Sequence, residues 1–264
     1  MKTEFSNNQF DSAYPDGIEH HWWFFARNRI LARTINSFAG PKSCLLEVGC
    51  GRGIVVESLR DAGLDCSGVE LAKNVRPAYT AEKHVRVGMD AVELSDTERQ
   101  RYDTILLLDV IEHIPEPVPF LRNLVDAFPN LSRIVITVPA RQELWSNYDE
   151  FYGHHRRYTL EMLETLSGEL CWDLNRKSYF FHSVYLPAWL MAKLKKNRET
   201  HLKSPQGLNR LLHRLISYAM IFDYYLFPRH LSGTSVIGCF LLGKNASQQS
   251  TAPDCSSAIL QSGG

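Results

Sequence analysis

The stretch LLEVGCGRG, residues 45–53, decides how this chain folds. It begins as an apolar run and leads directly into Gly49, Gly51 and Gly53, after which a helical pattern starts. Glycines let the backbone turn sharply and approach a ligand closely, and the amide groups at the start of the helix then point at that ligand. The stretch therefore predicts a strand, a ligand-binding loop and a helix.

The residues around this loop indicate which ligand it binds. The dinucleotide fingerprint G-x-G-x-x-G fails, because Ile54 occupies the position of its last glycine. Glu47 lies just before the first glycine, where a carboxylate repels a pyrophosphate but suits a cationic ligand. Glu70 ends the next apolar run, about twenty residues past the loop, where an acid takes ribose hydroxyls in nucleotide-binding folds. The loop therefore favours a nucleoside that carries an amino acid over a nicotinamide dinucleotide.

Short apolar runs alternate with helical patterns along most of the chain. The expected strands are residues 43–48, 66–71, 84–87, 103–109, 133–138, 174–181 and 235–242, and the expected helices are residues 54–63, 119–128 and 160–168. Strands that alternate with helices form parallel sheets with crossover helices on both faces. The pattern predicts an α/β fold with a doubly wound, mostly parallel, seven-stranded sheet.

Three segments fall outside this alternation. Residues 1–40 are rich in aromatic side chains and are expected to form an N-terminal helical cap on the domain of residues 41–244. Residues 182–232 are expected to be a helical insertion before the last strand. The polar tail of residues 245–264 is expected to be disordered.

The composition excludes several classes of protein. The 29 basic and 29 acidic side chains balance, which disfavours a general polyanion-binding protein. The six cysteines include no C-x-x-C pair, which indicates a reduced protein rather than a disulfide scaffold or a zinc ribbon. The first residues lack the apolar core expected of a secretory signal, and no run approaches the roughly 20 apolar residues that span a bilayer. These features predict a cytoplasmic protein.

Four motifs together resemble those of the class I S-adenosylmethionine-dependent methyltransferases. They are E-x-G-x-G-x-G (residues 47–53), the acid Glu70, MDA (residues 89–91) and LLLDVIEHIPEP (residues 106–117). The resemblance covers residues 40–140 and implies a Rossmann-like fold, S-adenosylmethionine as the cofactor and S-adenosylhomocysteine as the product. The implied cofactor-binding residues are Glu47, Gly49, Cys50, Gly51, Gly53, Glu70, Leu71, Asp90, Asp109 and Trp22.

The resemblance also assigns roles to three acids. Glu70 would take both ribose hydroxyls, Asp90 the adenine amino group and Asp109 the methionine end of the cofactor. Taken alone, the residues leave other roles open. Glu47 would also suit a strand end, Asp90 a turn and Asp109 a helix cap.

The leader and the insertion each leave two interpretations open. Residues 22–25 are four consecutive aromatics that cannot share one helix face. A similar W-F-x-x-R leader caps the cofactor in the methyltransferase domain 23 group, so Trp22 or Trp23 either does the same or packs the helix on the sheet. Residues 180–228 join apolar and aromatic runs to a basic cluster. This segment is either an interfacial helix in peripheral contact with a membrane or a buried helical subdomain.

The stretch YGHHRRYT, residues 152–159, lies in a segment of about twenty residues that follows the fifth expected strand. Its position at the carboxyl edge of the sheet and its match to the family pattern D-x-x-x-G-H-x-R-R-Y indicate the acceptor-side wall. His154 is the candidate base, and His113 and Tyr148 are further catalytic candidates. Arg156 and Arg157 would hold either an anionic group of the acceptor or the acids of the loop.

A metal site is the alternative use of the same residues. Asp109, Glu112, His113 and His154 resemble the E-x-x-E-H…H site of small-RNA terminal 2′-O-methyltransferases, and ubiquinone-pathway O-methyltransferases carry a related E-x-x-E-H. Asp109 is one methylene shorter than the glutamate of those motifs, and a divalent metal is not favoured.

The predicted function is methyl transfer from S-adenosylmethionine to a hydroxyl of a small-molecule, sugar or lipid-linked acceptor. One alternative is metal-assisted methylation of a ribose hydroxyl at an RNA end, and another is a cofactor-binding scaffold without turnover. A nucleic-acid partner is disfavoured, because the sequence contains no broad basic face and no RNA-binding module. The sequence does not predict the acceptor, the oligomeric state or the pathway.

Overall fold

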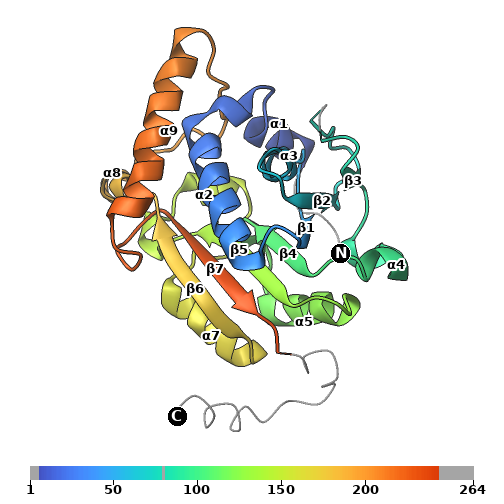
Figure 1. Cartoon of the computed structure of the whole chain (residues 1–264). Helices are drawn as coiled ribbons and strands as arrows, with labels where there is room; N and C mark the ends of the chain where they lie inside the picture. The colour runs from blue at the N-terminus through green and yellow to red at the C-terminus, as the bar shows by residue number, and fades with distance from the viewer. Residues whose placement is uncertain (1–5, 79–80, 244–264) are drawn as a thin grey trace.

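The computed structural model describes residues 6–78 and 81–243; the tail of residues 245–264, expected to be disordered, lies outside them. A sheet of seven strands in the order β3-β2-β1-β4-β5-β7-β6 occupies the centre of the molecule (Figure 1). The strands are β1 (Cys44–Val48), β2 (Asp65–Glu70), β3 (Val85–Val87), β4 (Thr104–Leu108), β5 (Arg133–Pro139), β6 (Asp173–Phe180) and β7 (Ser235–Leu241). Among them, β7 alone runs in the direction opposite to the other six, so the predicted doubly wound, mostly parallel sheet is confirmed.

Helices cover both faces of this sheet (Figure 1). The α-helices are α1 (Asn7–Ala13), α2 (Trp22–Ala39), α3 (Ile54–Asp61), α4 (Asp96–Arg99), α5 (Pro117–Ala127), α6 (Asn147–Phe151), α7 (Leu160–Leu170), α8 (His182–Lys193) and α9 (Leu208–Leu226). Short 3₁₀ turns are η1 (Ile18–His20), η2 (Ala91–Glu93), η3 (Ile111–His113) and η4 (Gln142–Leu144). Thr159 caps α7, since its side chain accepts the amide of Met162 at 3.2 Å.

The central strand β4 divides its side chains between two hydrophobic cores. Its sequence TILLL is buried throughout, as is typical of a strand covered on both faces. Ile105 and Leu107 join the core beneath α5 and α7, whereas Leu106 and Leu108 join the core beneath α2 and α3. The two cores fix the carboxyl ends of β1 and β4, where the strand order reverses and α/β folds bind their ligands.

Helices α8 and α9 form the segment between β6 and β7. Helix α9 packs along α2, and its Asp223 accepts the amides of His182 and Ser183 at 2.8 Å each, which caps the start of α8. No helix in the described part of the chain is both long enough and apolar enough to cross a membrane. The division into a cap (residues 1–40), a main domain (residues 41–244) and an insertion (residues 182–232) stays a prediction.

Candidate active site

The glycine loop links β1 to α3 with a left-handed backbone. Gly51 has φ +54°, and a Cβ at this residue would lie 3.3 Å from the ring of Tyr14, which comes from the leader. Gly53 has φ +78° and begins α3, and a Cβ there would lie 2.5 Å from the side chain of Val85. Both positions therefore require glycine for backbone conformation and for space.

Two buried carboxylates lie beside the loop. Glu70 accepts the amide of Gly51 and the amide of Ala72, each at 2.9 Å, so it holds the loop against the end of β2. Glu47 has one carboxylate oxygen, Oε2, that is buried and lacks a hydrogen-bond partner among the described residues. Burial raises the pKa of Glu47 to about 8. An uncompensated buried acceptor of this kind suits a ligand that brings a cationic donor.

Asp109 follows β4 with φ +61°, a strained conformation for a residue other than glycine. Its Oδ2 accepts the Nη2 of Arg27 at 2.7 Å, and its Oδ1 accepts the hydroxyl of Thr137 at 3.3 Å. Arg27 is buried on α2, and its guanidinium carbon lies 5.1 Å from the centre of the Trp23 ring. Our site prediction did not include Arg27, although it is the arginine of the W-F-x-x-R leader.

The YGHHRRYT segment is organised by Asp149, a fully buried acid on α6. Its Oδ1 lies 2.9 Å from Nδ1 of His154, and Arg157 donates to it through Nε at 2.8 Å and Nη2 at 3.0 Å. Burial would raise the pKa of Asp149, but hydrogen bonds from His154 and Arg157 lower it to about 2. Arg157 therefore holds the loop. Arg156 donates to the carbonyl of Pro115 instead of pairing with a loop acid.

Three of the four metal candidates lie together. The ligand atoms of Glu112, His113 and His154 lie within 4.8 Å of one another, whereas Asp109 is not part of this group. Neither carboxylate oxygen of Glu112 has a hydrogen-bond partner among the described residues, and burial raises its pKa well above the usual value. Burial lowers the pKa of His113 to about 3, and its ring centre lies 4.7 Å from that of His154.

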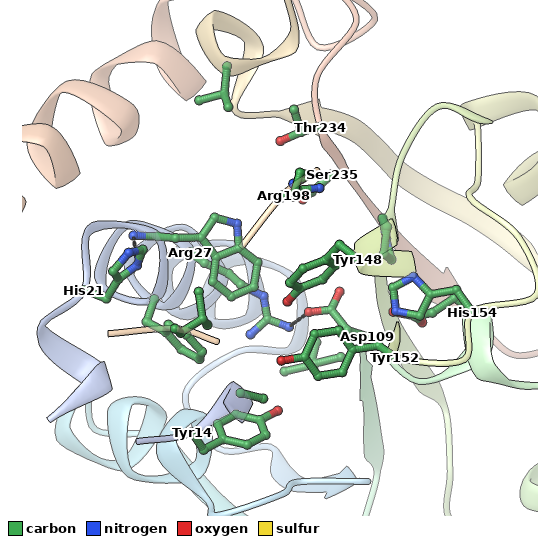
Figure 2. Close-up of a pocket in the computed structure, with 18 of the residues that line it drawn as sticks. Tyr14, His21, Arg27, Asp109, Tyr148, Tyr152, His154, Arg198, Thr234 and Ser235 are labelled. Carbon is green, nitrogen blue, oxygen red and sulfur yellow. Dashed lines mark hydrogen bonds and ion pairs between the residues drawn. The ribbon is translucent and has the colours of Figure 1, made fainter. Parts of the chain in front are cut away.

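A cavity of about 470 Å³ joins these groups. Of the residues predicted from the sequence, it is lined by Trp22, Trp23, Glu47, Gly49, Cys50, Asp109, Glu112, His113, Tyr148, His154 and Arg157. Figure 2 shows Arg27 on one side of Asp109 and His154 on the other, with Tyr148 next to Asp109 and Tyr14 lower in the view. One cavity therefore contacts both the glycine loop and the YGHHRRYT segment.

Five predicted cofactor residues lie outside the lining of this cavity. They are Gly51, Gly53, Glu70, Leu71 and Asp90. Tyr14 lies over Gly51, and its carbonyl accepts the Nη1 of Arg52 at 2.6 Å, so the leader covers this part of the loop. Asp90 caps η2, where its side chain accepts the amide of Val92 at 3.3 Å, in agreement with the turn role left open above.

The prediction also missed residues that the leader and the insertion contribute. Tyr14 lines the cavity from the leader, and Val184, Pro187 and Met191 line it from α8. Arg198 follows α8, and its guanidinium carbon lies 4.8 Å from the centre of the Tyr148 ring. The arginine has no carboxylate partner among the described residues. Composition alone could not place these side chains, because their positions depend on how α8 packs over the sheet.

Comparison with known proteins places this architecture in a family. Residues 23–214 match the family model described as "Methyltransferase domain". The ubiquinone biosynthesis O-methyltransferase of Methylococcus capsulatus (strain ATCC 33009 / NCIMB 11132 / Bath) is 31% identical over 117 residues, which are 37% of this chain and 48% of that protein. The protein of the same name from Hydrogenovibrio crunogenus (strain DSM 25203 / XCL-2) is 30% identical over 178 residues, 64% of this chain and 68% of that protein.

Solved structures agree on the fold. The plantazolicin methyltransferase BpumL in complex with SAH is similar with a TM-score of 0.50 and 16% identity, and the match covers 90% of this chain and 91% of that chain. The fold and the glycine loop define a class I methyltransferase. The chain belongs to the methyltransferase domain family, and the predicted dependence on S-adenosylmethionine is confirmed. The match to the Methylococcus protein spans about half of that relative's length.

Proposed function

We propose that this chain transfers the methyl group of S-adenosylmethionine to a hydroxyl of a small-molecule, sugar or lipid-linked acceptor. The observation that carries the proposal is the buried pair of Asp149 and His154, which reaches the cavity that the glycine loop also lines. The relatives named as ubiquinone biosynthesis O-methyltransferases support oxygen as the methylated atom. The cytoplasmic location expected from the sequence forms part of this proposal.

The residues beside the loop fit the charges of the cofactor. The partnerless Oε2 of Glu47 and the carboxylate of Asp109 would accept hydrogen bonds from the methionine ammonium group, and Arg27 would donate to the carboxylate. Each oxygen of Glu70 accepts one amide and keeps a lone pair for a ribose hydroxyl. Gly49, Gly51 and Gly53 would let the backbone approach. Asp90 would reach the adenine amino group, with Cys50 and Leu71 beside it and Trp22 as a lid.

The catalytic step needs alignment and a proton acceptor. The sulfonium cofactor supplies an activated methyl group when it is bound. If the Nδ1–H group of His154 donates a hydrogen bond to the carboxylate of Asp149, then Nε2 carries a lone pair that can accept the proton of the acceptor hydroxyl. Transfer forms the oxygen–methyl bond, breaks the sulfur–methyl bond and leaves the hydroxyl proton on His154, with S-adenosylhomocysteine as the product. His113 and Tyr148 would orient the hydroxyl, because both line the cavity near His154.

The walls of the cavity favour an apolar acceptor with an acidic group. Tyr148, Tyr152 and the α8 residues Pro187 and Met191 supply aromatic and aliphatic surface. Arg198, which lacks a carboxylate partner among the described residues, would hold a carboxylate or a phosphate of the acceptor. This is one of the two roles that the sequence left open for Arg156 and Arg157.

Metal-assisted transfer is the second candidate, and the buried carboxylate of Glu112 is the observation that favours it. This carboxylate, His113 and His154 offer the mixed oxygen and nitrogen ligands of a borderline divalent ion. Such an ion would lower the pKa of an acceptor hydroxyl, as in methylation of a ribose at an RNA end. In that case Asp109 would act with the cofactor rather than with the metal.

Two measurements separate these candidates from a scaffold without turnover. Calorimetry with S-adenosylhomocysteine tests the cofactor site. Both an enzyme and a scaffold would bind this ligand. Transfer of tritium from methyl-labelled S-adenosylmethionine into cell extracts tests turnover. Binding without transfer into any extract fraction would contradict the proposed activity, and transfer that stops on addition of a chelator would favour the metal-assisted candidate.

We also propose peripheral membrane contact through residues 180–228. Helix α8 supports it, because Pro187 and Met191 line the cavity while Leu186 and Leu190, on the same helix, are 65% and 50% exposed. A helix that is apolar all round is normally buried, and this one is not. An apolar acceptor could then pass from a lipid surface along α8 into the cavity.

A further inference from the structure

A second cleft, separate from the catalytic cavity, lies where α2 and α9 meet β6 and β7. It has a volume of about 270 Å³. Its charged lining residues are all basic: Arg33, Arg176, Lys177 and Arg229. None of the described residues that line it is acidic, so the cleft concentrates positive charge.

The three arginines of this cleft have no carboxylate partners among the described residues. Arg33 donates to the hydroxyl of Tyr225 at 3.4 Å, and Arg176 donates to the hydroxyl of Ser37 at 2.9 Å. Arg229 is exposed and makes no side-chain hydrogen bond or ion pair with the described part of the chain. Lys177 differs, because it pairs with Glu164. Guanidinium groups gathered in this way suit a phosphate, which accepts several of their hydrogen bonds at once.

An exposed apolar stripe on α9 continues from the cleft. It consists of Leu211, Leu215, Tyr218, Phe222 and Tyr225, which are between 55% and 63% exposed. Their spacing of three or four residues places them on one face of the helix. Tyr225 belongs to both features, because it lines the cleft and ends the stripe. A contiguous exposed stripe of this kind marks an interaction surface.

The charge around the stripe identifies its occupant. Residues 182–231 carry eight basic side chains but two acidic ones, Glu199 and Asp223, and Asp223 is buried as the cap of α8. A second copy docked through the same face would bring identical cations together, because a twofold interface is self-complementary. A nucleic acid would leave the leucines uncovered. An anionic bilayer satisfies both features, with phosphates for the arginines and acyl chains for the stripe.

We propose that the cleft binds the phosphate headgroup of an anionic lipid while the α9 stripe enters the bilayer surface. This site extends the membrane contact proposed above, but it does not depend on the catalytic reaction. Arg33 and Arg229 are outside the lining of the catalytic cavity. An experiment can therefore contradict the proposed lipid site without contradicting the proposed transfer reaction, and the reverse.

The test is sedimentation with vesicles of phosphatidylcholine alone and of phosphatidylcholine mixed with phosphatidylglycerol, at low salt. The unaltered chain should bind the mixed vesicles and not the neutral ones. The double variant Arg33→Gln/Arg229→Gln should bind them about thirtyfold more weakly, or about fivefold for each positive charge removed near the surface. The control Lys42→Gln/Lys83→Gln removes two exposed charges that do not line the cleft and should bind almost as the unaltered chain does.

A further variant and a soluble phosphate ligand identify the role of the stripe and the source of the phosphate. Leu215→Ser/Phe222→Ser keeps every charge and should also weaken vesicle binding. All variants should keep the affinity for S-adenosylhomocysteine and the melting temperature, which separates this site from the catalytic cavity. Equal binding of the arginine and lysine variants would overturn the proposal. So would binding of soluble glycerol phosphate without vesicle binding, or a dimer that Leu215→Ser/Phe222→Ser dissociates.

Discussion

The two sides of the catalytic cavity are built in different ways. The glycine loop on the cofactor side is local: the end of β1 and the loop that follows it supply residues 47–53, and Glu70 at the end of β2 holds the loop amide of Gly51, while Arg27 and Asp109 join this side from other elements. The acceptor side collects single side chains from separate elements, namely His113 after β4, Tyr148 on α6, and Arg198 after α8. A short stretch of sequence can encode the glycine loop, whereas only the assembled fold creates the acceptor side.

The strongest test of this contrast is His154→Ala on the acceptor side. Turnover should fall by about a hundredfold or more, the usual contribution of a general base, while affinity for S-adenosylhomocysteine stays unchanged. The measurement is tritium transfer per folded molecule, together with calorimetry.

His155→Ala is the matched control, because His155 is exposed and its tie to Glu112 is a backbone hydrogen bond of 2.8 Å that the substitution leaves in place. It should keep most of its activity. If His154→Ala lowers only the melting temperature and leaves the rate per folded molecule intact, His154 is a structural residue of the loop.

On the cofactor side, Glu70→Ala should weaken binding of S-adenosylhomocysteine by about thirtyfold. The carboxylate would lose its hydrogen bonds to the ribose, each worth about 1 kcal/mol or more for a charged acceptor, and would release the amide of Gly51. Calorimetry measures the affinity, and Glu82→Ala, which removes an exposed acid, is the control. A Glu70→Ala variant that binds as tightly as the unaltered chain would refute the ribose role.

The same two sides show which parts of the fold and the site could be predicted from the sequence. Strands such as β4 were predicted correctly because a continuous apolar run between turn residues has few other stable conformations. The glycine loop was identifiable because Gly51 and Gly53 meet steric demands within one local unit. Arg27 and Arg198 were missed as site residues. Arg27 contacts Asp109 across 82 residues of sequence, and Arg198 contacts Tyr148 across 50. A local sequence pattern cannot indicate contacts between residues so far apart.

The pairing of Arg157 with Asp149 lies between these cases, because the sequence predicted it only as one of two alternatives. The sequence left two roles open for the arginines of residues 156–157: binding an anionic group of the acceptor or pairing with an acid of the loop. The choice depended on which of these side chains is buried. Burial of Asp149 decides it, because an isolated buried carboxylate is costly and so recruits the nearby guanidinium of Arg157. Arg156 is left to bond the carbonyl of Pro115.

The raised pKa of Glu47 predicts a pH dependence confined to the cofactor side. Burial raises this pKa to about 8, so in the free protein the group is mostly protonated at neutral pH. A cationic ammonium group beside it favours the charged form, and binding should therefore release a proton. Affinity should increase with pH up to about 8, by at most about tenfold per unit, and then level off. Calorimetry in buffers of different ionisation enthalpy counts the protons.

Glu47→Gln is the matching variant, because it keeps the shape and removes the titration. Its affinity should be lower and nearly independent of pH between 6 and about 8, the interval set by the raised pKa. A variant that keeps the full pH dependence would assign the proton to another group. Asp149 is an unsuitable candidate, since its pKa of about 2 leaves it ionised throughout this interval.

The smallest expected effect concerns Glu112, and it decides between the two acceptor-side mechanisms. Burial raises the pKa of this carboxyl well above its usual value and so favours its neutral form, and Glu112→Gln supplies a neutral side chain of similar shape. If His154 acts as a base, both Glu112→Gln and dialysis against a chelator should change turnover by less than about twofold. If Glu112, His113 and His154 hold an ion, the chelator should abolish turnover, added divalent metal should restore it, and Glu112→Gln should lose as much activity as His154→Ala. Measuring both variants with and without chelator distinguishes the mechanisms even if one variant is unstable, because the chelator leaves the covalent structure of the chain unchanged.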